Sequence, residues 1–223
     1  MRPYFVTQTR RLTTATLFLT LLSACSPLLP TPTAQPRLYA LSPAENKAPP
    51  ATATGAATLL VSPPQAAAGF DSRHIIYVRQ PYQLEYYAHS EWVDTPARML
   101  APLIVSAIED TAAFAAVIVS PSGASGDLTL HVEIIRLQHE VSHQPAQARF
   151  TLRAYLVANA TRQVIASREF EQTVIADSET PYGGVQAANR AVHRVLQELA
   201  GFCQEIGQNW AKIPVDRRTM KLN

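Results

Sequence analysis

The sequence predicts a mixed α/β sandwich in which a largely antiparallel sheet packs against two long amphipathic helices. Two segments repeat apolar residues at three- and four-residue steps, as helices with one buried face do. Several others alternate apolar and polar residues, which is typical of strands with one face on a core. With 223 residues, of which 47% are hydrophobic, the chain is long enough for one domain with its own core.

The composition excludes several classes of protein. A formal net charge of +2, from 19 basic and 17 acidic residues, is too balanced for a nucleic-acid binder. Two cysteines exclude a disulfide-rich scaffold, and no apolar run reaches the length of about 18 residues that a polytopic membrane protein needs. We therefore expect a globular domain whose ends have separate roles, and no nucleic-acid partner.

The N-terminus resembles a bacterial export signal that ends in a lipobox. Three arginines precede an uncharged apolar stretch at residues 12–22, and the motif Leu-Ser-Ala-Cys ends at Cys25. We expect residues 1–24 to be removed and Cys25 to carry diacylglyceryl and N-acyl lipid. An ordinary secretory signal with a chance cysteine is the alternative. Because Ser26 rather than aspartate follows, the resemblance to Gram-negative lipoproteins implies sorting to the periplasmic face of the outer membrane.

A proline-rich tether and two short strands follow the cysteine. We assign the lipidated tether to residues 25–36, and its eleven residues after Cys25 would reach roughly 34 Å at about 3.1 Å each. The alternation at residues 37–42 predicts a short strand that docks on the domain. The apolar run at residues 59–62 predicts a buried strand, which ends where two prolines that cannot donate to a sheet follow.

The next segments predict a hairpin and a helix. Residues 73–78 and 82–87 are rich in β-forming side chains and flank a proline turn, which indicates two paired strands. Thr95 followed by proline suits the start of a helix of about five turns that ends before residue 117. Pro102 lies inside this pattern and should kink the helix or delay its regular start.

The C-terminal half predicts an antiparallel meander and a second helix. Residues 127–141 and 147–158 alternate apolar and polar residues, and after a turn residues 164–175 return as a third long strand. An apolar stripe over residues 183–209 predicts a helix near 40 Å long, at about 1.5 Å per residue. One domain therefore spans residues 37–212, and residues 213–223 form a polar tail.

No group of residues assembles an active site. His139 and His143 are four residues apart, but on a strand that spacing covers about 13 Å, so we expect solvent-facing histidines and no metal site. Cys203 lies in an apolar helical context, where we expect a packed thiol rather than a catalytic thiolate. The sequence therefore predicts a protein that is not an enzyme and holds no cofactor apart from the lipid on Cys25.

The densest aromatic cluster lies between the second strand and the first helix. Tyrosine and tryptophan combine a large apolar area with a polar tip and are enriched at protein interfaces. Packing in the core is the alternative interpretation of the same cluster. Together with two arginines of the hairpin, the candidate partner-binding residues are Arg73, Tyr77, Arg79, Tyr82, Tyr86, Tyr87 and Trp92.

The order of five short motifs resembles the ABC-type transport auxiliary lipoproteins, which include the PqiC-like lipoproteins. The motifs are the lipobox, LYALSP at residues 38–43, LVSPP at 60–64, DSRHIIY at 71–77 and WVDTPA at 92–97. The resemblance extends over nearly all of the chain after the tether. It departs at the alanine-rich residues 65–69, where nothing aligns.

This resemblance implies a fold and a function. The fold would be a three-layer sandwich similar to the N-terminal domain of TolB, without catalytic residues. The function would be that of a membrane-anchored periplasmic accessory protein in an MCE-associated lipid transport system. Its partners would be an MCE-domain protein and the ABC permease and ATPase, with docking to the envelope-spanning partner or to a second copy of the chain. An outer-membrane assembly lipoprotein and a lipoprotein hydrolase are the alternatives.

Overall fold

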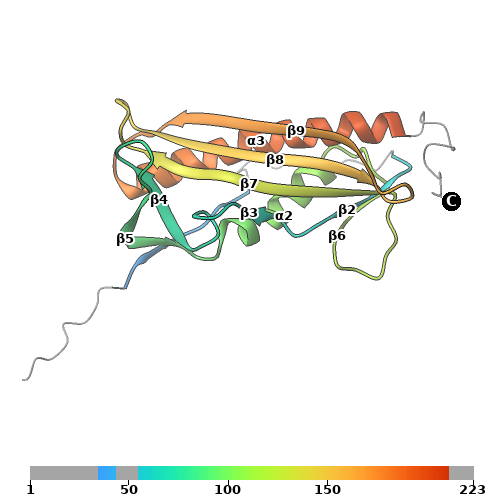
Figure 1. Ribbon diagram of the computed structural model, residues 1–223, viewed down its shortest axis with the longest axis horizontal. Helices are drawn as coiled ribbons and strands as arrows, with labels where there is room; N and C mark the ends of the chain where they lie inside the picture. Colours follow the sequence, from blue (N-terminus) through green and yellow to red (C-terminus); the bar gives the residue numbers. More distant parts are fainter. Residues whose placement is uncertain (1–34, 44–54, 211–223) are drawn as a thin grey trace, which may run out of the picture. The chain divides into compact units, whose positions relative to one another are not determined.

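Nine strands and two helices make up the described part of the chain, residues 35–43 and 55–210 (Figure 1). In this computed structural model the strands are β1 (Arg37–Tyr39), β2 (Thr58–Val61), β3 (Gln65–Ala66), β4 (His74–Val78), β5 (Glu85–Trp92), β6 (Ala116–Val119), β7 (Leu128–Glu140), β8 (Gln147–Ala158) and β9 (Gln163–Ile175). The helices are α2 (Pro96–Glu109) and α3 (Pro181–Trp210), and neither combines the length and hydrophobicity that crossing a membrane requires. The predicted signal, Cys25 and the polar tail lie outside the described residues, so those boundaries stay predictions.

The long strand β7 organises the sheet because it pairs along both of its edges. Its antiparallel pairing with β8, and that of β8 with β9, forms the predicted meander. Along its other edge β7 pairs in parallel with β2, β3 and β4 at successive positions. β5 is antiparallel to β4, as predicted, while β1 is parallel to β5 and β6 is parallel to β2. The sheet is therefore mixed, and its two longest pairings are antiparallel.

The core lies between one face of this sheet and both helices. Alternate residues of β7 and β8 are fully buried, among them Ile134, Phe150 and Leu152. α3 contacts β7, β8 and β9 and also packs against α2, and Figure 1 shows both helices behind the sheet. The mixed sheet and the two amphipathic helices confirm the predicted fold class.

The boundaries of α2 follow local chemistry that periodicity alone does not show. The helix begins at its predicted first residue, and Thr95 before it is extended, although its side chain makes no capping hydrogen bond. The helix continues through Pro102, so this proline does not delay its start. It ends at Glu109, earlier than predicted, because the chain turns there and the Thr111 hydroxyl donates to a carbonyl of the last turn at 2.7 Å.

Two side chains of α3 hold the segment that follows β1. Asn189 accepts a hydrogen bond from the backbone N–H of Ser42 at 2.9 Å and donates to the carbonyl of Ala40 at 3.3 Å. Nε2 of His193 donates to the carbonyl of Ser42 at 2.7 Å. Three backbone groups are therefore fixed by the helix, which confirms that the predicted N-terminal strand docks on the domain.

Candidate docking surface

The predicted aromatic cluster divides between the surface and the core. Tyr82, at the tip of the β4–β5 hairpin, is fully exposed, and Tyr86 is 57% exposed. Trp92, at the end of β5, is 2% exposed and packs in the core. Burial alternates along this end of β5, where Ser90 and Trp92 face inward. The structure therefore removes Trp92 from the candidate contact residues, because a partner cannot reach its side chain.

Tyr77, Arg79 and Glu85 form one polar unit on the hairpin. The Glu85 carboxylate accepts hydrogen bonds from the Tyr77 hydroxyl at 2.9 Å and from Nε of Arg79 at 3.0 Å. The Arg79 guanidinium also lies 5.3 Å from the centroid of the Tyr77 ring. The hydrogen bond to Glu85 raises the pKa of Tyr77, and the hydrogen bond from Arg79 lowers the pKa of Glu85. Because these groups satisfy one another, they stiffen the hairpin and leave little free charge for a partner.

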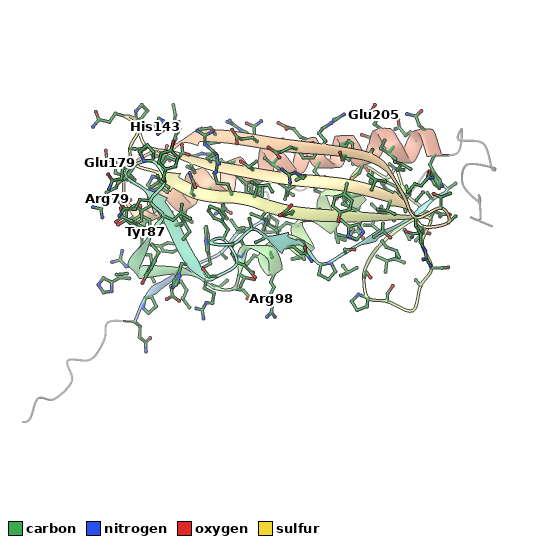
Figure 2. All side chains as sticks on the ribbon, viewed as in Figure 1. Arg79, Tyr87, Arg98, His143, Glu179 and Glu205 are labelled. Atoms are coloured by element: carbon green, nitrogen blue, oxygen red, sulfur yellow. The ribbon has the colours of Figure 1, made fainter. Side chains whose placement is uncertain are left out.

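Tyr87 points inward and joins the hairpin to β7. Its ring stacks on Tyr77 with 4.4 Å between centroids, and its hydroxyl lies 2.8 Å from Nδ1 of His139. Burial raises the pKa of Tyr87 to about 12 and lowers the pKa of His139. Figure 2 shows Arg79, Tyr87 and His143 at the same end of the sheet. Tyr87 is thus a structural link, and its hydroxyl is not available to a partner.

His139 is buried by the start of α3. It is 2% exposed, so the expectation of a solvent-facing histidine is wrong for His139, whereas His143 is exposed. A Cβ on Gly184 would lie 2.5 Å from Nδ1 of His139, which means that the glycine lets the helix approach the ring. Nε2 of His139 has no hydrogen-bond partner among the described residues. Gly184 lies in the segment 183–209 that was predicted as a helix from its apolar stripe, and that stripe gives no sign of this contact.

Cys203 and the potential metal ligands are the other side chains whose chemistry bears on function. No group of three or more potential ligands there is arranged to hold a metal ion. Cys203 is fully buried in α3, as the sequence predicted, and burial raises the pKa of its thiol to about 12. A thiol with that pKa is protonated at neutral pH and is a poor nucleophile.

The outer face of the sheet carries a ladder of opposite charges that was not predicted from the sequence. Arg149 bridges Glu140 at 2.8 Å and Glu171 at 2.9 Å, and Arg153 pairs with Glu169 at 2.8 Å. Burial alone would raise the pKa of Glu140, but hydrogen bonds, foremost from Arg149, lower it. The available signal was that Arg149 and Arg153 share one face of β8 and that Glu169 and Glu171 share one face of β9. Since these charges are paired across strands, they hold the meander together.

The exposed aromatic side chains gather on the outer side of the hairpin. Tyr86 stacks on His74, with 4.2 Å between ring centroids and 11° between planes. Arg73 donates to the carbonyl of Trp92 at 3.0 Å and lies 3.4 Å from Glu91, which stands opposite His74 in the strand register. We call Arg73, His74 and Tyr86 the outer patch. It combines a stacked aromatic pair with an arginine from the adjacent chain position, and tyrosine and arginine are both enriched at protein interfaces.

Comparison with known proteins agrees with this fold. The family model of the ABC-type transport auxiliary lipoprotein component matches residues 39–200. The crystal structure of protein XCC0632 from Xanthomonas campestris is 27% identical with a TM-score of 0.69, covering 78% of this chain and 98% of that chain. A crystal structure of an uncharacterized protein is 14% identical with a TM-score of 0.59, covering 77% of this chain and 99% of that chain. No curated protein matches the sequence.

Proposed function

The chain belongs to the ABC-type transport auxiliary lipoprotein components, and we propose that it is a non-catalytic accessory subunit of a lipid transport system. In this proposal the lipid on Cys25 holds the domain at the periplasmic face of the outer membrane. The partners are an MCE-domain protein that spans the envelope and the ABC permease and ATPase. The family is defined as a transport component, which supports an accessory role.

The outer patch is the observation that supports docking to the envelope-spanning partner. Binding energy at protein interfaces concentrates in a few aromatic and arginine anchors that become desolvated. Tyr86 is 57% exposed, yet its stacking on His74 restricts its ring, so little side-chain freedom is lost on binding. Arg73, the residue before His74, keeps a half-exposed guanidinium 3.4 Å from Glu91. The patch is therefore preorganised for a partner.

The test replaces Tyr86 and a matched tyrosine elsewhere. Tyr155 stacks on His131 in the same way, with 4.8 Å between centroids, but lies on the meander. Tyr86→Ala should weaken copurification with the MCE-domain partner by about 2 kcal/mol, or about 30-fold in Kd, if Tyr86 is an anchor. Tyr155→Ala should leave binding unchanged, and both variants should keep the wild-type Tm within a few degrees.

The result can refute the proposed surface. If Tyr86→Ala copurifies with the partner as the wild type does at low protein concentration, the interface lies elsewhere. A loss of binding that tracks a fall in Tm would instead show that Tyr86 supports the fold. Equal losses in the Tyr86 and Tyr155 variants would point to a general effect of removing exposed aromatic residues.

A further inference from the structure

The tip of the β4–β5 hairpin, residues 80–84, presents large apolar groups to solvent. Tyr82 is fully exposed and Leu84 is 48% exposed. The tip contains no charged residue, and the side chain of Gln80 donates a hydrogen bond to that of Gln83. Two of its polar groups therefore satisfy one another. The hairpin ends in an uncharged surface from which an aromatic ring and a leucine project.

The chain enters the domain from the side of this tip. β1 is parallel to β5, and Arg37 at its start stands beside Ser90. Ser90 lies five residues, or about 17 Å, from Glu85 at the start of β5. The tip lies just beyond Glu85 in the same direction. Figure 1 shows the start of β1 and the hairpin at one end of the sheet and the β8–β9 turn at the other. β1 therefore begins on the side of the domain where the tip lies.

Contacts with α3, as well as the pairing with β5, fix the direction of β1. The segment after β1 is held by Asn189 and His193 through three backbone hydrogen bonds. β1 therefore cannot turn about its own pairing with β5 without breaking contacts to α3. An anchor attached upstream of β1 would draw the hairpin end of the domain, and not its opposite end, toward the membrane.

We propose that the hairpin tip lies in the headgroup layer of the membrane that carries Cys25, an inference that rests on the lipid attachment in the proposed function. The eleven residues between Cys25 and Arg37 reach roughly 34 Å, enough to pass the 17 Å of β5 and the tip. Tyrosine rings gather at membrane–water interfaces because they are amphipathic, and leucine favours the apolar side. The lipid anchor keeps the tip at a high effective concentration near the surface, so two side chains suffice.

The test places a tryptophan at each end of the lipidated full-length protein. Tyr82→Trp reports on the tip, and Val164→Trp, at a position 59% exposed beside the β8–β9 turn, is the matched control. The native Trp92 and Trp210 are 2% and 6% exposed and contribute the same background fluorescence to both variants. This background is measured in the unsubstituted protein. The protein is reconstituted in phosphatidylethanolamine and phosphatidylglycerol vesicles whose acyl chains are brominated near the headgroup.

We expect brominated lipid to quench Tyr82→Trp, with a blue shift of its emission, and to leave Val164→Trp unchanged. Equal quenching of both variants, or quenching of Val164→Trp alone, would overturn the proposed orientation. No quenching of Tyr82→Trp in a protein whose lipid is verified by mass spectrometry would overturn the tip contact and leave the lipid attachment standing. Absence of the lipid would overturn both. A blue shift that appears only when the MCE-domain partner is added would assign the tip to that protein instead.

Discussion

Gly184 allows α3 to start directly against the buried ring of His139. A Cβ at this position would lie 2.5 Å from Nδ1 and 2.7 Å from Cγ of the ring, closer than such atoms approach one another. His139 is 2% exposed, so neither the ring nor the helix has free space to move into. We therefore expect Gly184→Ala to overpack this contact, which costs about 1–3 kcal/mol in typical cores.

Two further effects set the net change in the free energy of unfolding. A displaced ring would lose its hydrogen bond to the Tyr87 hydroxyl, now 2.8 Å long, and that loss costs about 1 kcal/mol. The higher helix propensity of alanine offsets up to about 1 kcal/mol. The expected net loss is about 2 kcal/mol, most of it from the steric overlap.

Urea unfolding followed by circular dichroism measures this change against a matched control. Gly201 lies in the same helix, and a Cβ there would meet nothing within 4 Å. Gly201→Ala should therefore be as stable as the wild type or more stable by up to about 1 kcal/mol. If Gly184→Ala gains stability as Gly201→Ala does, the helix does not approach His139 as closely as described.

Three other predictions concern cysteine chemistry and pH. Cys25→Ser should leave an unprocessed, unacylated precursor, detectable by mass spectrometry, whereas a normally cleaved soluble protein would indicate an ordinary secretory signal. Cys203→Ala should keep activity in cells, and Cys203→Ser should lower stability further because a dry site would hold an unpaired hydroxyl; a folded but inactive Cys203→Ala protein would argue for a catalytic thiol. Burial lowers the pKa of His139 from 6.5, so its contribution to stability is complete above that value and is lost as the pH falls toward the folded-state pKa. The free energy of unfolding should therefore fall less between about pH 7.5 and pH 5 in His139→Gln than in the wild type, and equal slopes would contradict this assignment.

The sequence predicted those elements in which the element's own pattern of apolar residues shows which face is buried. β7 and β8 alternate apolar and polar side chains, and α3 carries a continuous apolar stripe, so each could be recognised without knowing its neighbours. The parallel pairing of β7 with β2, β3 and β4 could not, because it depends on contacts between distant segments. The end of α2 also depended on a local turn at Thr111 that apolar periodicity does not register.

The candidate surface was harder to predict for the same physical reason. Which face of β5 meets the core depends on its pairing with β4, and the register shifts between His74 and Ile76. This decides that Trp92 is buried and Tyr86 exposed, although both belong to one aromatic cluster. The burial of His139 depends on Gly184, which is far along the chain and acts through its missing side chain.

The hairpin separates groups that hold the fold from groups that remain free to bind. The Tyr77 hydroxyl already donates to Glu85, and the Tyr87 hydroxyl is hydrogen-bonded to His139. A partner that recruited either hydroxyl would break a bond that the domain now makes. Tyr82 and Tyr86 make no hydrogen bond through their hydroxyls among the contacts of the described residues, and both rings are exposed. Binding energy is gained most readily where no internal bond must be broken first. Substitution of Tyr87 should therefore lower stability and docking together, whereas substitution of Tyr86 should lower docking alone.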